Sequence, residues 1–224
     1  TKTSWIANLS RQTPKRLLNV ADALRKGFQK SELNRITHFD PWFLDQIEQV
    51  IIKEAELKRD GVPTTPEKMQ ELKSMGFSDK RIGLITGNPE KNIRNLRHDF
   101  KVFPAFKRVD TCAGEFESHT PYLYSTYGAT HSALYECEAN PTNRDKIIIL
   151  GGGPNRIGQG IEFDYCCCHA CIGLTSSGYE TIMINCNPET VSTDYDTSDR
   201  LYFEPLSLES VLEIIRVEQK NGNI

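Results

Sequence analysis

The chain has 224 residues, of which 38% are hydrophobic and 25% are charged, and its formal net charge is −3. This composition is sufficient for a packed core and argues against wholesale disorder. The longest apolar runs, at 147–150 and 165–168, fall far short of the roughly 18 to 20 residues that a membrane span needs. The negative charge also argues against a general nucleic-acid binder. The first residues lack a methionine and a signal-peptide core, which favours a piece excised from a longer chain.

The cysteines indicate the redox compartment. Seven are present, and four of them, Cys166, Cys167, Cys168 and Cys171, lie within six residues. Adjacent cysteines pair poorly with each other, and a chain of this size does not need disulfides to fold. We therefore expect free thiols and a cytoplasmic protein.

The chain changes character near residue 145. Residues 1–145 carry 22 lysines and arginines against 19 aspartates and glutamates, whereas residues 146–224 carry 5 against 11. The junction at 138–145 is polar and rich in turn-forming residues. We predict one domain over residues 1–145 and a second over 146–224.

The first part is predicted to be helical. Apolar residues at helical spacing, including Leu17, predict a helix that stops at Gly27. The other predicted helices begin with a capping residue at Asp40, Thr65, Ser78 and Asn88, and the second and third of these should end at Gly76 and Gly87. The helical pattern fails between 103 and 135, where tyrosines at 122, 124 and 127 suggest a packed, extended segment.

The second part is predicted to be α/β. Buried strands are expected at 146–150 and 180–185, with a helix of small residues from about 160 or 163 to 176 between them. Ser207 should cap a further helix, and 221–224 resembles the turn into a third strand. This order of elements implies a parallel sheet.

The loop after the first of these strands, residues 151–160, contains five glycines. The spacing of a dinucleotide fingerprint fails because Arg156 occupies the sixth position, and the phosphate-loop pattern fails because Gln159 replaces its lysine. The glycines could simply permit a tight turn. However, Asn155 and Arg156 beside Gly158 and Gly160 would also suit a small polar passage or an anion site at a helix N-terminus.

Other short patterns favour structural readings. Cys168 and Cys171 have zinc-like spacing, but no second pair completes a site, so buried small hydrophobes are favoured. The acidic run at 194–199 lacks the features of a calcium loop and is expected to be solvated or paired with Arg200. Residues 74–79 resemble a ubiquitin-associated or helix-turn-helix loop, as any compact helical hairpin does.

Two long strings carry a family resemblance: GGGPNRIGQGIEFDY at 151–165 and NCNPETVSTDYDTSDRLYF at 185–203. They resemble the carbamoyl-phosphate synthetase large chain, as do shorter strings at 39–44, 106–112 and 122–127. The resemblance covers nearly the whole chain and is loose before about Leu18. It implies a helical oligomerization domain at 1–145 and, at 146–224, the start of the second Rossmann-like pre-ATP-grasp domain. Residues Gly128–Tyr135 depart from the family as an insertion.

The resemblance further implies the reaction of the parent enzyme. A separate small glutaminase subunit supplies ammonia, bicarbonate is activated by one ATP, and the resulting carbamate is phosphorylated by a second ATP. ATP, magnesium or manganese, and potassium serve the parent, whose product feeds arginine and pyrimidine synthesis. We expect no cofactor, metal or catalytic residue in this segment, no ATP turnover by it, and no nucleic-acid or membrane partner.

In that family carbamate crosses between the two halves through an internal tunnel. Gly160 matches a tunnel position, and Asn155, Arg156, Glu162 and Asn187 are candidates to line or support it. The segment would thus serve assembly, through 1–145 and with the rest of the large chain, and channelling. The alternative is an independent module that binds a nucleotide through the glycine loop or a protein through the helices.

Overall fold

The computed structural model describes residues 2–128, 136–154, 156, 158, 160 and 162–224. The chain forms two compact units, residues 1–96 and 97–224, which we call the helical unit and the α/β unit. Apart from Gly128, the insertion predicted at Gly128–Tyr135 lies outside the described residues. The compact units divide the chain between residues 96 and 97, and the domain boundary predicted at 145/146 stays a prediction.

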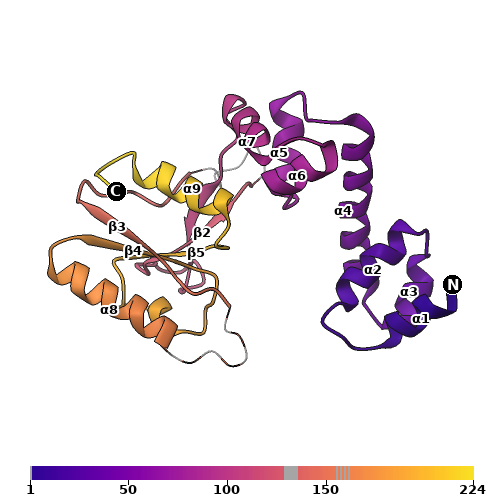
Figure 1. Ribbon diagram of the computed structural model, residues 1–224, viewed down its shortest axis with the longest axis horizontal. Coiled ribbons are helices and arrows are strands. Elements are labelled where there is room, and N and C mark those ends of the chain that lie inside the picture. Colours follow the sequence, from indigo (N-terminus) through magenta and orange to yellow (C-terminus); the bar gives the residue numbers. More distant parts are fainter. Residues whose placement is uncertain (1, 129–135, 155, 157, 159, 161) are drawn as a thin grey trace. The chain divides into compact units, whose positions relative to one another are not determined.

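In the helical unit, short helices follow one another along the chain (Figure 1). They are α1 (Lys2–Ser10), α2 (Arg16–Arg25), α3 (Lys30–Thr37), α4 (Pro41–Asp60), α5 (Pro66–Ser74), α6 (Asp79–Thr86) and α7 (Glu90–Asp99), whose last turn lies in the α/β unit.

The predicted caps are present at three of these helices. Asp40 accepts from the backbone N–H of Trp42 at 2.9 Å, and Thr65 and Ser78 cap α5 and α6 in the same way. Each cap satisfies a donor that the helix itself leaves unpaired. Gly87 ends α6 in the left-handed conformation at φ 71°, where glycine has no steric penalty. The local sequence therefore determines where α4, α5 and α6 begin.

Two helices of this unit, α1 and α3, were not expected from the sequence. α1 carries no acidic residue in its first turn and no basic residue in its last, and Gln29 before α3 makes no capping bond. Their apolar residues pack instead with those of α2 and α4, in a core formed by Leu9, Val20, Ala23, Leu33 and Leu44. α2 confirms the helix predicted before Gly27, in which Leu17 lies with a 55% exposed side chain.

The α/β unit is built on one five-stranded sheet with the order β1-β2-β5-β4-β3. The strands are β1 (Ala105–Arg108), β2 (Tyr122–Thr126), β3 (Lys146–Leu150), β4 (Glu180–Asn185) and β5 (Arg200–Phe203). In this sheet β2 pairs in parallel with β5, β5 with β4, and β4 with β3, whereas β1 pairs with β2 in the antiparallel direction. This confirms a mostly parallel sheet, with β3 and β4 at the predicted residues. The sequence pattern did not predict β1 or β5, and it indicated β2 only as an extended segment.

Helices cover both faces of this sheet (Figure 1). They are α8 (Glu162–Ser176) and α9 (Leu208–Glu218), and a short 3-10 helix, η2, spans Val191–Thr193. Successive side chains of β4 point to opposite faces. Ile182 and Ile184 pack with Ile214 of α9, whereas Met183 packs with Cys171 of α8. The chain's last residues begin to pair beside β3, since Asn223 lies parallel to Asp145.

Charged residues begin β3, β4 and β5. With two residues further along the chain they form a buried network, which we call the amino-edge cluster: Lys146, Glu180, Arg200, Tyr202 and Glu218. The Lys146 ammonium lies 2.9 Å from the carboxylate of Glu218, and both side chains are fully buried. Arg200 lies 2.7 Å from Glu180, and the Tyr202 hydroxyl donates to Glu218. Burial and the adjacent Glu218 carboxylate raise the pKa of Tyr202. The charges of this edge are therefore paired with one another inside the α/β unit.

Candidate functional site

The opposite edge of the sheet collects the ends of the parallel strands. β3, β4 and β5 end at Leu150, Asn185 and Phe203, and the glycine loop at 151–160 leaves from the first of them. In open parallel sheets this carboxyl edge is where ligands are bound. The predicted site residues that the structure describes, Arg156, Gly160, Glu162 and Asn187, lie in the segments that follow β3 and β4, so the sheet brings them to one edge.

Asn185 organises this edge, although sequence reasoning did not single it out. Its side chain is 1% exposed, and its Oδ1 accepts from the backbone N–H of Gly153 at 3.2 Å, Cys186 at 2.9 Å and Asn187 at 3.4 Å. One side-chain oxygen thus joins the start of the glycine loop to the turn after β4. The signal in the sequence was a polar residue at the end of an apolar strand, and its meaning depends on the pairing of β3 with β4.

The first glycines of the loop have structural explanations. A Cβ on Gly151 would lie 2.5 Å from the Asn185 side chain, which real side chains do not tolerate. Gly153 adopts φ 73°, a left-handed conformation that favours glycine. Residue 151 therefore requires glycine because the loop packs against Asn185 there, and residue 153 favours glycine because of its backbone conformation.

Gly160 has a different environment. It is exposed, and its φ lies outside the left-handed range. The three atoms nearest to a Cβ built there all belong to the carboxylate of Glu162, the far end of an exposed and flexible side chain that can turn away. The backbone conformation of Gly160 therefore does not require glycine, and a larger side chain would need the Glu162 side chain to move.

The other predicted residues have separate placements. Glu162 begins α8, and its carboxylate stands beside Gly160. Asn187 is half-buried, and its Oδ1 accepts from the backbone N–H of Glu189 at 3.0 Å. Arg156 is exposed, and Asn155 lies outside the described residues. The structure thus brings together Gly160 and Glu162, and it connects Asn187 to the loop through Asn185.

A second residue that sequence reasoning missed is Asp164, in the first turn of α8. Its carboxylate accepts from the backbone N–H of Ser192 at 2.9 Å and so fixes the residues of η2. Burial alone would raise the pKa of Asp164, but hydrogen bonds from Ser192 and Thr190 outweigh it and lower the pKa. Asp164 therefore stays ionised and holds the segment after β4 against α8.

Glu204 lies one residue beyond β5, with a 6% exposed side chain. Its carboxylate accepts from the backbone N–H of Ser125 in β2 at 2.5 Å. Burial raises the pKa of Glu204, and the hydrogen bonds from Ser125 only partly offset this effect. The charged form is therefore less favourable in the folded state than in the unfolded chain.

We expect Glu204→Gln to stabilise the α/β unit at pH 7, because burial raises the pKa of Glu204 and so disfavours its charged form in the folded state. The amide still accepts from Ser125 but carries no charge to bury. In acid the Glu204 carboxyl is protonated in both the folded and the unfolded state, so it costs no stability. Because its pKa is raised on folding, the charged carboxylate lowers the free energy of unfolding once the pH rises above the pKa of the unfolded chain. Urea denaturation at pH 4 and pH 8 should show a gain at pH 8 only. The exposed control Glu115→Gln should show none, and an equal gain at both pH values would contradict the prediction.

The cysteines of α8 do not have the character of metal ligands. Burial raises the pKa of Cys168 to about 11 and that of Cys171 to about 12, so both are neutral thiols at pH 7. Cys171 is fully buried, whereas Cys166 is exposed, so the expectation of buried hydrophobes holds for only part of the cluster. In the described part of the chain, no three His, Cys, Asp or Glu side chains gather closely enough to hold a metal ion.

The acidic run was expected to be solvated or paired with Arg200, and the first alternative is confirmed, since Asp194, Asp196 and Asp199 are all exposed. Asp199 accepts from the backbone N–H and the hydroxyl of Thr181, at 2.8 and 3.0 Å, and its cationic neighbour is Arg144 at 3.4 Å. Arg200 belongs to the amino-edge cluster instead, because β5 begins at that residue and turns its side chain towards Glu180 and Glu218.

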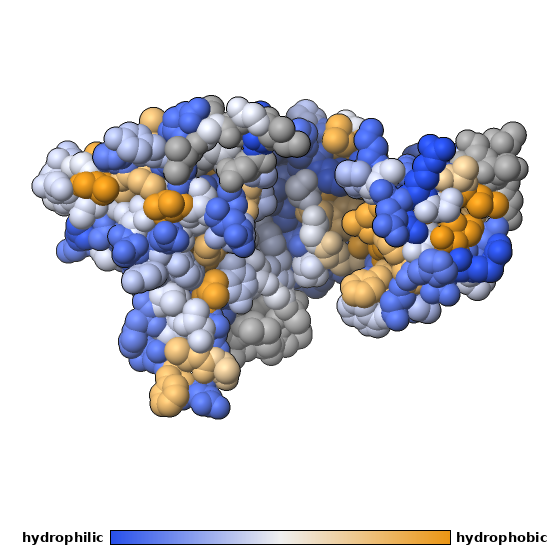
Figure 2. Space-filling view, turned by 90° about the horizontal axis from the view of Figure 1, so that it is seen from below, coloured by the Kyte–Doolittle hydropathy of each residue, from blue (hydrophilic) through white to orange (hydrophobic). Residues whose placement is uncertain are grey.

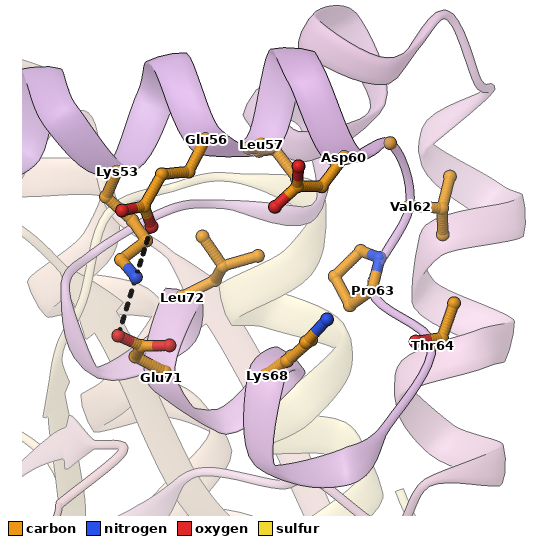
Figure 3. Close-up of a pocket in the computed structure, with 11 residues that line it drawn as sticks. Lys53, Glu56, Leu57, Asp60, Val62, Pro63, Thr64, Lys68, Glu71 and Leu72 are labelled. Atoms are coloured by element: carbon orange, nitrogen blue, oxygen red, sulfur yellow. Dashed lines mark ion pairs between the residues drawn. The ribbon is translucent and has the colours of Figure 1, made fainter.

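The helical unit has a pocket of about 170 Å³ between the end of α4 and α5 (Figure 3). Figure 3 shows Lys53 between Glu56 and Glu71, and its ammonium lies 2.7 Å from each carboxylate. Leu57 and Leu72 form an apolar wall. The pocket is small, and its lysine is already neutralised by two carboxylates, so we assign it to the packing of α5 against α4.

Comparisons with known proteins match both parts of the chain. The family described as the carbamoyl-phosphate synthetase large chain oligomerisation domain matches residues 1–101, and the carbamoyl phosphate synthase preATP-grasp domain matches residues 143–224. Among curated proteins, the carbamoyl phosphate synthase large chain of Rhizobium meliloti is 54% identical over 97% of this chain. That of Pseudomonas syringae pv. tomato is 59% identical over 93% of it.

The chain spans 19% of the length of each of these two relatives. The two family matches cover separate parts of this segment, an oligomerisation domain followed by a preATP-grasp domain, and the identity extends over nearly all of it. This chain corresponds to the part of those large chains that contains the oligomerisation domain and residues of the preATP-grasp domain. The chain therefore belongs to the carbamoyl phosphate synthase large-chain family.

Proposed function

We propose that this chain is the assembly and channelling segment of a carbamoyl phosphate synthase large chain, an ATP-dependent ligase. The parent would make carbamoyl phosphate from bicarbonate, ammonia delivered by a small glutaminase subunit, and two ATP, for arginine and pyrimidine synthesis. The observation that carries the proposal is the glycine loop at the carboxyl edge of the parallel sheet, within a sequence 54% identical to a known large chain.

Within this proposal the loop forms part of a passage for carbamate. Gly160 would leave the passage open, while Asn155, Arg156, Glu162 and Asn187 line or support it. The exposed position of Gly160 beside the carboxylate of Glu162 supports this role. ATP, magnesium or manganese, and potassium would bind in other parts of the parent enzyme.

Residues 1–145 would serve assembly, both with the rest of the large chain and between copies. The match of residues 1–101 to an oligomerisation domain supports this assignment. All seven cysteines are free thiols, which supports a reducing compartment and hence the cytoplasm. Separately, no helix in the described part of the chain is both long and apolar enough to cross a bilayer.

The chain alone should not hydrolyse ATP, because the proposal assigns nucleotide binding to other parts of the parent. A coupled phosphate-release assay with bicarbonate and ammonia should give the buffer rate for the 224-residue chain. The longer enzyme, assayed alongside, should form carbamoyl phosphate. Turnover by the pure chain, or tight nucleotide binding in calorimetry, would favour an independent nucleotide-binding module instead.

The chain should also self-associate. Sedimentation velocity between about 1 and 200 µM should show the sedimentation coefficient rising with concentration, as expected for reversible dimers or larger species. A strictly monomeric result over this range would count against an assembly role for residues 1–145.

A further inference from the structure

The carboxyl ends of β3, β4 and β5 are joined through one buried residue, Asn185. Its backbone carbonyl accepts from the N–H of Glu204, which follows β5, at 3.3 Å. Its side-chain Oδ1 accepts from the N–H of Gly153, after β3, and from those of Cys186 and Asn187, after β4. Each segment that leaves this edge of the sheet is therefore hydrogen-bonded to the same residue.

The amide group of Asn185 also packs against the start of the glycine loop. A Cβ on Gly151 would lie 2.5 Å from both Cγ and Nδ2 of Asn185. The amide thus occupies the space that a side chain at residue 151 would fill. This contact and the hydrogen bond to Gly153 hold the first residues of the loop in one position relative to the end of β4.

Asn185 acts through these neighbours, because it does not reach the surface. Figure 2 shows the outside of the α/β unit at the left of the view, where apolar residues are scattered among hydrophilic ones. Asn185 belongs to no such surface, since it is 1% exposed. Buried backbone donors need a partner, and Oδ1 supplies one to three of them. Without it the donors are left unpaired unless the loop moves, which favours a displaced loop.

We propose that Asn185 is a positioning residue for the transfer of carbamate between the two halves of the parent enzyme. The proposal rests on the passage proposed above and adds the group that fixes its walls relative to each other. The glycine loop forms one wall, and Asn187 belongs to the segment after β4. Oδ1 of Asn185 lies 3.2 Å from the backbone nitrogen of Gly153 and 3.4 Å from that of Asn187. Because one atom holds both segments, its loss frees both.

A loop released in this way should let carbamate escape. Carbamate decomposes in water, so the first half would continue to consume ATP while less carbamate reaches the second half. The expected signature is a rise in the amount of ATP hydrolysed per carbamoyl phosphate formed, with both partial reactions retained. A residue that only stabilises the fold would lower all rates together, because less enzyme is folded, and would leave this ratio unchanged.

Asn185→Ala in the longer enzyme removes the acceptor and tests the proposal. With bicarbonate and ammonia as substrates, the ratio of ATP hydrolysed to carbamoyl phosphate formed should rise at least about fivefold, the factor that one lost hydrogen bond of typical strength gives. Asn185→Asp keeps an acceptor oxygen for the same three N–H groups, which also stabilise its charge, so its ratio should stay close to that of the wild type. If Asn185→Ala does not fold, Asn185→Ser replaces it with the same expected rise, because its shorter side chain withdraws the acceptor from Gly153.

The matched control is Thr181→Ala, near the other end of the same strand. Thr181 is also buried, and its hydroxyl donates to the carboxylate of Asp199 at 3.0 Å. This variant loses a buried hydrogen bond at the amino edge of the sheet, away from the end where the glycine loop begins. It should therefore lower the melting temperature and leave the ratio unchanged.

The remaining outcomes overturn the proposal. An unchanged ratio in Asn185→Ala, or an equal rise in Thr181→Ala, would mean that Asn185 only stabilises the fold. A ratio as high in Asn185→Asp as in Asn185→Ala would mean that the acceptor oxygen is not the cause. Gly160→Phe, assayed in parallel, separates this failure from that of the passage. If Gly160→Phe uncouples the halves and Asn185→Ala does not, the passage stands without this role for Asn185, whereas full overall synthesis in both variants contradicts both proposals.

Discussion

Replacing Gly160 by phenylalanine in the longer enzyme should uncouple its two halves. Overall formation of carbamoyl phosphate is expected to fall at least about tenfold, equivalent to about 1.4 kcal/mol or more in the overall barrier. Bicarbonate-dependent ATP hydrolysis, the partial reaction of the first half, should continue. ATP synthesis from ADP and carbamoyl phosphate, the partial reaction of the second half, should continue as well. Carbamate that cannot pass the added ring would decompose in water before it is phosphorylated.

The structure supports this expectation over simple misfolding. Gly151 and Gly153 could not be replaced without a clash with buried Asn185 or a strained backbone. At Gly160 the nearest atoms to a new Cβ belong to the carboxylate of Glu162, which is exposed and can rotate away. A protein with phenylalanine at this position should therefore fold.

The matched control is Gly173→Phe, which adds the same ring to an exposed position of α8 where nothing lies within 4 Å. All three rates should be measured on one preparation of each variant. Loss of both partial reactions in Gly160→Phe, with the control unaffected, would indicate a structural role for this glycine. Unimpaired overall synthesis would exclude a role in the passage.

Local signals allowed much of the fold to be predicted. Asp40, Thr65 and Ser78 each satisfy a backbone donor within three residues, so their effect can be read from the sequence alone. The apolar runs of β3 and β4 similarly depend only on their own burial. In contrast, β5 has only four residues and follows an acidic turn, and β1 is defined by its pairing with β2. Such short strands have no signal of their own, because their partners lie far away in sequence.

The site shows the same division. The glycine-rich loop was visible in the sequence, but the different reasons for its glycines were not. Gly151 is required because the Asn185 side chain lies against it, and that contact exists only once β3 and β4 pair. The amino-edge cluster was invisible for the same reason, since Lys146 and Glu218 are 72 residues apart. Sequence patterns located the site, whereas tertiary contacts determine which residues hold it in place.

Glu218→Ala should be the most destabilising single change in the amino-edge cluster, at about 3 to 5 kcal/mol. The carboxylate is fully buried and accepts from the Lys146 ammonium at 2.9 Å and from the Tyr202 hydroxyl. Alanine leaves the ammonium buried with only the backbone carbonyls of residue 218 and Asn221 as partners. A loss of this size is a large fraction of the 5 to 15 kcal/mol that stabilises a typical domain.

Urea denaturation followed by circular dichroism measures this loss as a lower midpoint of the α/β unit. The control Gln219→Ala, at the exposed next residue, should shift the midpoint little. A second variant separates the unpaired charge from lost packing: Lys146→Met combined with Glu218→Leu removes both charges and keeps the volume. Because desolvating an ion pair offsets most of its attraction, this double variant should recover a large part of the stability that Glu218→Ala loses. If the double variant is as unstable as Glu218→Ala, the buried Lys146 charge is not the cause, and the hydrogen bonds of Tyr202 and Arg200 to Glu218 must carry the effect.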